Sequence, residues 1–241
     1  MMISNTWGGR WNGVAPVGDQ HSRARTIVRH TGGIVRGKFP SRKNGRMVHH
    51  EGLLELDAIY LFEASPRVIR YREQPTTIQY PDGVKLRRYT PDFELVLDGG
   101  DTVFIEVKPV RSLEGEGVRH KLQKVTSYLN RAAKRFVILT GDTLRQEPSL
   151  SNLKWIYHQA ARIPPSPDLI RVAVKHFRDQ FPLSLEKAET LFKAYGVDPY
   201  SLLLAGSLSC SLTQPISPDT QVTLVKENDD DWFWISQEHG F

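Results

Sequence analysis

Residues 89–108 read YTPDFELVLDGGDTVFIEVK, and this stretch decides the fold that the sequence predicts. Apolar and polar residues alternate on both sides of the turn signal at residues 98–101, which predicts a β-hairpin. Side chains two residues apart on a strand share a face, so Glu106 and Lys108 project together. With Asp92 they supply two carboxylates and one ammonium, the groups needed to hold Mg²⁺ against a phosphodiester and to activate a water.

The sequence alone does not decide on which face of the hairpin Asp92 lies. If Leu97 opposes Thr102 across a four-residue turn, Asp92 opposes Val107 and points away from Glu106. Either a β-bulge or a bend at Pro91 would then have to re-aim the carboxylate. A Glu-x-Lys pattern on an exposed strand is also common as a plain solvated face, so the hairpin alone does not establish a site.

A second carboxylate lies upstream, on a predicted helix over residues 52–63. Leu54, Ala58, Leu61 and Phe62 form one apolar stripe at helical spacing. Glu55 lies at the edge of that stripe, where a carboxylate is costly unless a positive group meets it or its head reaches water. Glu51, one turn earlier, competes with Glu55 for this role.

Several of these motifs occur in a fixed order along the chain. Glu55 lies on a helix that ends at Ser65-Pro66, Gln74-Pro75 ends the next strand, and residues 89–92 read YTPD before EVK at 106–108. This order resembles the TnsA family, the endonuclease subunit of heteromeric cut-and-paste transposons. The resemblance covers roughly residues 36–109 and implies an α/β, restriction-endonuclease-like fold, with a mixed sheet flanked by helices.

The resemblance also implies a mechanism. Asp92, Glu106 and the Val107 carbonyl would bind Mg²⁺, for which Mn²⁺ would substitute, and Glu55 would add a ligand directly or through water. Lys108 would orient or deprotonate the attacking water and offset charge on the phosphate. These four side chains (Glu55, Asp92, Glu106 and Lys108) are the expected catalytic residues.

The expected partners follow from the same family. The protein would cut double-stranded DNA at transposon 5′ ends, alongside a DDE-type transposase subunit and an ATPase regulator subunit. Two alternatives remain: a free-standing restriction or repair nuclease of the same fold, and a non-catalytic DNA-binding scaffold.

Composition fits an intracellular protein that contacts nucleic acid. The chain has 241 residues, a net charge of +5 and a single cysteine, which excludes an internal disulfide and a Cys-based zinc site. The sequence shows no apolar run typical of a signal peptide or a membrane span, so we expect a cytoplasmic protein that does not engage a membrane.

Basic residues gather before the first helix. Residues 21–46 hold eight Lys or Arg and no acid, interrupted by glycines, which predicts a flexible arm suited to DNA phosphates. A second basic cluster lies on a predicted helix over residues 118–133. The expected DNA contacts are Arg36, Lys38, Arg42, Lys43, Arg46, Lys121 and Lys124.

The rest of the chain predicts a strand over 135–140, parallel to a neighbour, then a helix over 151–158 and a proline-rich linker at 163–168. Helices over 169–181, 185–195 and 199–208, with a hairpin of 212–215 and 221–225, suggest a small winged-helix-like domain. Its third helix has no basic residue, which favours protein packing or an accessory role over DNA binding. The predicted domains are a basic arm (1–46), an endonuclease domain (47–163), the winged-helix-like domain (164–226) and an acidic aromatic tail (227–241).

The tail carries three consecutive aromatic residues after an acidic run: Trp232, Phe233 and Trp234. Such a cluster is too apolar for a free solvated tail. We expect it to bind a partner, with packing on the protein's own small domain as the alternative.

Overall fold

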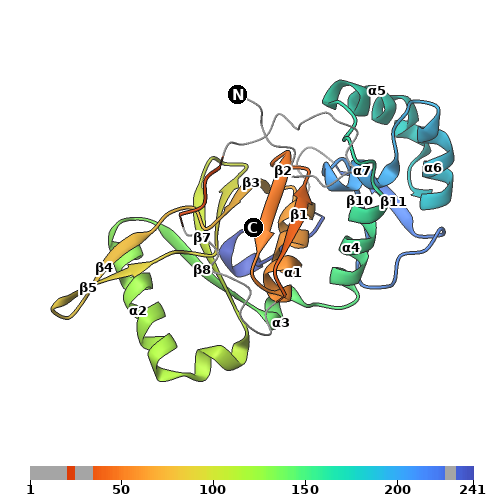
Figure 1. Ribbon diagram of the computed structural model, residues 1–241. Helices are drawn as coiled ribbons and strands as arrows, with labels where there is room; N and C mark the ends of the chain where they lie inside the picture. Colours follow the sequence, from red (N-terminus) through yellow and green to blue (C-terminus); the bar gives the residue numbers. More distant parts are fainter. Residues whose placement is uncertain (1–20, 25–34, 226–231) are drawn as a thin grey trace. The chain divides into compact units, whose positions relative to one another are not determined.

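The computed structural model describes residues 21–24, 35–225 and 232–241 (Figure 1). The chain divides into two compact units. The first contains residues up to Ile59 together with Ile69–Gly141, and the second contains Tyr60–Val68 and Asp142–Phe241. Each unit is described by itself.

A four-stranded mixed sheet forms the centre of unit 1, in the order β3-β6-β7-β8. Strands β6 and β7 are antiparallel, whereas β7 and β8 are parallel, so the predicted mixed sheet and the predicted parallel strand are confirmed. The crossover from β7 to β8 runs through the 3₁₀ turn η1 and helix α2. The bounds are β3 Val68–Glu73, β6 Phe93–Leu97, β7 Thr102–Lys108, η1 Val110–Glu114, α2 Glu116–Arg131 and β8 Arg135–Thr140.

Helix α1 (Leu53–Ala64) precedes β3 and forms where the apolar stripe predicts it. Ala58, Ile59 and Phe62 are completely buried. Within the sheet, Phe93, Leu95 and Ile105 are likewise fully buried, which is the alternation expected for strands with one face in a core.

Unit 1 also carries two β-hairpins outside the central sheet: β1 (Gly37–Ser41) with β2 (Arg46–His50), and β4 (Ile78–Asp82) with β5 (Lys85–Tyr89). The first hairpin corrects the predicted basic arm, because residues from Gly37 onward are a paired strand. Phe39 and Val48, which oppose each other, are both buried and hold the hairpin in the fold. Residues 1–20 and 25–34 of the predicted arm lie outside the described residues.

Unit 2 contains helices and a small sheet in the order β10-β11-β9. The structure differs from the sequence prediction in two places. Helix α7 ends at Leu204 and not at residue 208, because Gly206 adopts a φ of +68°. The strand expected at 212–215 is instead β10, at Leu208–Cys210. The bounds are α3 Gly141–Leu144, α4 Ser149–Gln159, α5 Pro167–Phe177, η2 Arg178–Gln180, β9 Leu183–Ser184, α6 Leu185–Lys193, α7 Pro199–Leu204, β10 Leu208–Cys210, β11 Gln221–Leu224 and η3 Gln237–His239. The winged-helix interpretation stays a prediction.

Helix α4 belongs to unit 2, although the sequence predicted a domain boundary later, at the linker near residue 163. The buried side chain of Asn152 accounts for this placement. Its amide donates to the backbone carbonyls of Leu212 and Gln214, at 3.1 and 2.7 Å, and its oxygen accepts from the Ile216 backbone at 3.0 Å. Hydrogen bonding therefore ties α4 to the segment between β10 and β11.

The described end of the chain packs within unit 2. Ile235 and Phe241 are buried, and the guanidinium of Arg67 lies 4.0 Å from the centre of the Trp234 ring. Trp232 and Phe233 are half-buried and meet edge to face. The aromatic residues thus have contacts of their own, and partner binding through them stays a prediction. Residues 227–231 of the predicted tail lie outside the described residues.

In the part of the chain that the structure describes, no helix has both the length and the apolar character needed to cross a bilayer.

Candidate active site

The register of the β6–β7 hairpin settles where Asp92 points. Phe93 opposes Ile105 and Val96 opposes Thr102, so one further step places Asp92 opposite Glu106. The backbone N–H of Leu97 donates to the Asp101 carbonyl at 2.9 Å, so Leu97 faces Asp101 and residues 98–100 form the turn. A register shift of one residue moves a side chain to the other face. The assumed pairing of Leu97 with Thr102 was therefore wrong, and neither a bulge nor a bend is needed to explain the face of Asp92.

Asp92, Glu106 and Lys108 form one cluster at the start of β6 and the end of β7. The Lys108 ammonium lies 2.7 Å from Glu106 Oε1 and 3.6 Å from Asp92 Oδ2. The Asp92 carboxylate also accepts the Val107 backbone N–H at 2.8 Å, which ties the two strands together at the site. The Glu-x-Lys pair is thus no plain solvated face, since Glu106 is 2% exposed.

Tyr89 also contacts Glu106, and it was not among the site residues predicted from sequence. Its hydroxyl donates a short hydrogen bond to Glu106 Oε2, and its ring is buried. Burial and the neighbouring Glu106 charge raise the pKa of Tyr89 far above its usual range, so the hydroxyl stays a donor. Glu106 is therefore held on one oxygen by Lys108 and on the other by Tyr89.

Glu55 and Glu51 both lie near this cluster, with different contacts. Glu55 Oε2 accepts the Glu51 backbone N–H at 2.7 Å, whereas Glu51 Oε1 accepts from Gln74 Nε2 at 3.2 Å. Burial raises the pKa of Glu55. The charge of Lys108 lowers this pKa, and the charge of Glu106 raises it. Both carboxylates thus stand at the start of α1, and the charge coupling links Glu55 to the strand residues.

Gln74 connects this group to Asp92 through its backbone. Its N–H donates to the Asp92 carbonyl at 2.8 Å, and its backbone has a φ of +45°, which is uncommon for a residue other than glycine. Its side-chain oxygen is buried and has no hydrogen-bond partner among the described residues. A residue that holds both Glu51 and the Asp92 backbone acts as a positioning residue for the site.

The charge balance of the cluster is negative. Three carboxylates, Glu55, Asp92 and Glu106, share one neighbouring ammonium, that of Lys108. Burial and the adjacent Glu106 charge raise the pKa of Asp92 well above its ordinary value. Burial opposes the charged form of Lys108, but the Asp92 and Glu106 charges outweigh it and raise the pKa of Lys108. Such a site gains from additional positive charge.

This donor set fits Mg²⁺ in chemistry, since carboxylate and carbonyl oxygens are the ligands that the ion takes. The side chains are arranged differently from a preformed metal cage. Over residues 21–24, 35–225 and 232–241, no three His, Cys, Asp or Glu side chains converge as a metal-ligand group. The Lys108 ammonium, between Asp92 and Glu106, supplies the positive charge in this arrangement.

The residues predicted to contact DNA differ in exposure. Lys38 and Lys124 are exposed, whereas Arg36, Arg42, Lys43 and Lys121 are half-buried. The Lys121 ammonium lies 5.6 Å from the centre of the Tyr89 ring, so α2 brings this cation close to the site.

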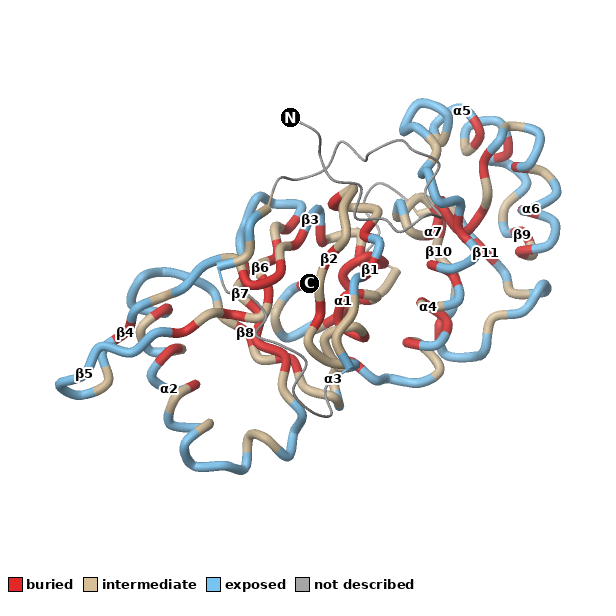
Figure 2. The backbone as a smooth tube through the Cα atoms, viewed as in Figure 1, coloured by how far each residue is buried: buried red, intermediate tan, exposed pale blue. Residues whose placement is uncertain are grey.

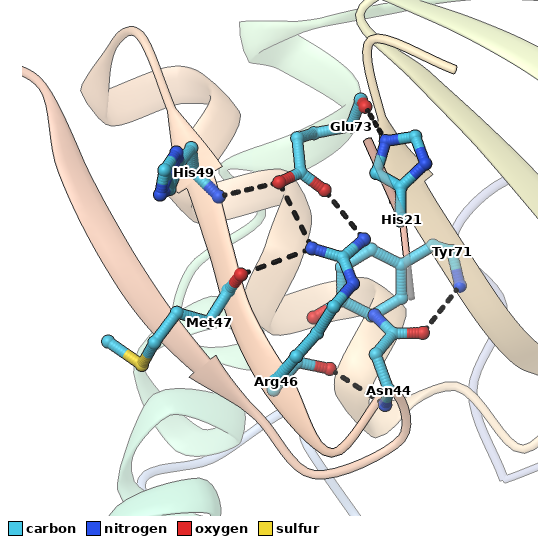
Figure 3. Close-up of polar contacts among 8 residues, drawn as sticks. His21, Asn44, Arg46, Met47, His49, Tyr71 and Glu73 are labelled. Atoms are coloured by element: carbon cyan, nitrogen blue, oxygen red, sulfur yellow. Dashed lines mark hydrogen bonds and ion pairs between the residues drawn. The ribbon is translucent and has the colours of Figure 1, made fainter. Parts of the chain in front are cut away.

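Arg46 makes the contacts of a structural ion pair, and its contact with DNA stays a prediction. Its two terminal nitrogens donate to the two oxygens of Glu73, at 3.0 and 2.7 Å (Figure 3). The His49 backbone N–H donates to the same carboxylate at 3.2 Å, and the ring of His21 bonds the Glu73 carbonyl at 2.6 Å. With Glu73 4% exposed, Arg46 fastens the β1–β2 hairpin to β3 instead of facing solvent.

Comparison with known proteins agrees with this geometry. Residues 65–141 match a family model described as the TnsA-like endonuclease N terminal. The matched segment contains Asp92, Glu106 and Lys108, whereas Glu55 precedes it. The match confirms the resemblance to TnsA-like endonucleases over residues 65–141. A search of curated proteins finds no match.

The hydrogen bond from Tyr89 to Glu106 can be tested by removing the hydroxyl. We expect Tyr89→Phe to lower the rate of DNA cleavage by roughly 10- to 100-fold, since groups that orient ligand carboxylates commonly contribute that much. The Mg²⁺ concentration for half-maximal cleavage should rise as well, a shift that simple loss of folded protein would not produce. Tyr80→Phe, the same change on β4, is the matched control. An unchanged Mg²⁺ dependence in Tyr89→Phe would show that the hydroxyl does not position Glu106.

Proposed function

We propose that this protein is a Mg²⁺-dependent DNA endonuclease that hydrolyses a phosphodiester bond during DNA transposition. The observation that carries the proposal is the Asp92–Glu106–Lys108 cluster within a TnsA-like endonuclease domain. Glu106 is buried, and Asp92 shares its face through the hairpin register. A non-catalytic scaffold would not require three carboxylates and an ammonium at one place, where their mutual repulsion and burial are unfavourable.

Asp92, Glu106 and the Val107 carbonyl would hold the ion, with Glu55 adding a ligand directly or through water. When bound, Mg²⁺ would supply Lewis acidity toward the phosphate and lower the pKa of the attacking water. Lys108 would orient that water and offset negative charge that develops on the phosphate. Tyr89, through its hydroxyl, keeps Glu106 facing the site, and Gln74 holds the backbone of Asp92.

The partners in this proposal are those that the family resemblance implies. The protein would cut one strand at the transposon 5′ ends, with a DDE-type transposase subunit acting on the 3′ ends and an ATPase regulator subunit in the same assembly. Trp232 and Phe233 would be available for such a contact, since both are half-buried. A free-standing nuclease would cut without these subunits.

The test is a strand-cleavage assay on duplex DNA with a transposon end, with and without the transposase subunit. We expect cleavage of one strand in Mg²⁺ and loss of cleavage in EDTA. Cleavage that survives metal removal would contradict the proposed chemistry. Activity that is equal on any duplex and independent of the transposase would favour the free-standing nuclease.

Calcium provides a second measurement. We expect Ca²⁺ to support DNA binding but not turnover, because it accepts the same oxygen ligands at longer distances and with looser geometry. Binding and cleavage would be followed on the same labelled duplex, with Mn²⁺ as the positive control. Rates in Ca²⁺ equal to those in Mg²⁺ would argue against the proposed role of the ion.

A further inference from the structure

The β4–β5 hairpin is a two-stranded ribbon whose turn consists of Gly83 and Val84 (Figure 1). Asp82 pairs with Lys85 across this turn, and Gly83 has a φ of +62°, a conformation suited to glycine at the first position of a two-residue hairpin turn. The ribbon is not part of the four-stranded sheet. Its contacts with the rest of unit 1 therefore come from elements other than that sheet.

One face is fixed to α2. Tyr80 and Tyr89 are buried in a cluster with Val125 and Leu129 of α2. Nearer the turn, Asp82 bonds the His120 ring of α2 at 2.8 Å. These contacts hold the ribbon along the helix from its base toward its tip.

The other face is exposed along its whole length (Figure 2). Two apolar side chains stand out, since Leu86 is 68% exposed and Val84, at the tip, is fully exposed. Neighbouring apolar side chains left in water are a mark of a binding surface. The residues of this outward face, with the tip, are Gln79, Pro81, Val84, Leu86 and Arg88.

The charge of the ribbon favours a polyanion as its partner. Strand β5 carries Lys85, Arg87 and Arg88, all exposed, and Asp82 is the only acidic residue from Ile78 to Tyr89. Asp82 is itself engaged by Arg87, at 3.2 Å, and by His120. Net positive charge beside exposed apolar side chains is the combination that DNA-contacting ribbons present to a groove.

The base of the ribbon is the proposed active site. Strand β5 ends at Tyr89, whose hydroxyl bonds Glu106, and Asp92 follows three residues later. At about 3.3 Å per residue, Val84 lies roughly 17 Å along the strand from Tyr89. Since a turn of DNA spans about 34–36 Å, the tip would meet the duplex roughly half a turn, about five base pairs, from the phosphate at the site.

We infer that the outward face of the β4–β5 ribbon lies in a groove of the DNA that the enzyme cuts, on one side of the cleavage point. This inference rests on the proposed nuclease function. Arg88 and Gln79 supply hydrogen-bond donors to phosphates or base edges, while Leu86 and Val84 supply apolar contact. The ribbon would thereby set the position of the cut relative to the contacted base pairs.

The position of the tip can be measured directly with a tethered cleavage reagent. The chain has a single cysteine, Cys210, and burial raises the pKa of its thiol to about 11. Val84→Cys in a Cys210→Ser background would carry an iron–EDTA group on an end-labelled duplex whose enzymatic cut is mapped first. Ca²⁺ would hold the complex uncut. Lys187→Cys, at an exposed position on α6, is the matched control.

We expect reagent cuts from the Val84 position to cluster roughly five base pairs from the enzymatic cut, on one side only. The Arg88→Glu variant should weaken duplex binding by about tenfold, whereas Lys187→Glu, with the same charge change, should have little effect. A dispersed pattern equal to that of Lys187→Cys, in an enzyme that still cuts, would overturn the ribbon inference alone. A wild-type protein that neither binds nor cuts duplex DNA would overturn the proposed function, and the inference with it.

Discussion

Replacing Asp92 with Asn should lower the rate of DNA cleavage by roughly 10³-fold or more, comparable with the loss of an essential acid–base or charge-stabilising group. The substitution removes one negative charge from the cluster but keeps an oxygen that can accept the Val107 N–H, now at 2.8 Å. Folding should therefore be retained. Burial already disfavours the charged carboxylate, as its raised pKa shows, so the variant should be at least as stable as the wild type.

The matched control is Asp98→Asn on the turn of the same hairpin. Asp98 is exposed and accepts the Gly99 backbone N–H at 2.9 Å, a bond that Asn can also accept. It should leave cleavage unchanged. Near-normal cleavage by a well-folded Asp92→Asn protein would remove Asp92 from the site.

Replacing Arg46 with Ala should destabilise the protein by about 3–5 kcal/mol, the usual cost of leaving one partner of a buried ion pair alone. The Glu73 carboxylate would keep its bond from the His49 backbone N–H but lose both bonds from the guanidinium. Urea unfolding followed by circular dichroism would measure the loss.

Lys38→Ala is the control for Arg46, since Lys38 is an exposed cation on the opposite strand of the same hairpin. Its effect on stability should stay within about 0.5 kcal/mol. A double variant, Arg46→Met with Glu73→Leu, should recover much of the stability because no buried charge is left unpaired. If Arg46→Ala weakened DNA binding while unfolding as the wild type does, Arg46 would be a phosphate contact and not a structural residue.

Much of unit 1 could be predicted from sequence because its signals are local. The alternation around residues 98–101 gave the hairpin, and the apolar stripe of residues 54–62 gave α1. The register was missed because it depends on whether the turn holds four or three residues. The Leu97–Asp101 backbone bond leaves three residues in the turn, and this difference alone places Asp92 on the face of Glu106.

The residues missed around the site share a different cause. Tyr89 bonds Glu106, 17 positions away, and Gln74 bonds Glu51, 23 positions away. The alternation of residues along one strand or helix cannot predict contacts between separate segments. Both belong to segments that the family resemblance already singled out, YTPD and Gln-Pro, which was the available signal. The ion pair of Arg46 was missed because a basic run interrupted by glycines is typical of a flexible arm, whereas Phe39 and Val48 are the local evidence for a packed hairpin.

The proposed chemistry requires that the Asp92 and Glu106 carboxylates bind a divalent ion. The most direct measurement is an anomalous difference map from crystals of the protein soaked in Mn²⁺. We expect a peak within bonding distance of both carboxylates in the wild type, and its loss in Asp92→Asn. A wild-type map with no peak at these two side chains, from protein that cleaves DNA in Mn²⁺, would show that they do not hold the catalytic ion.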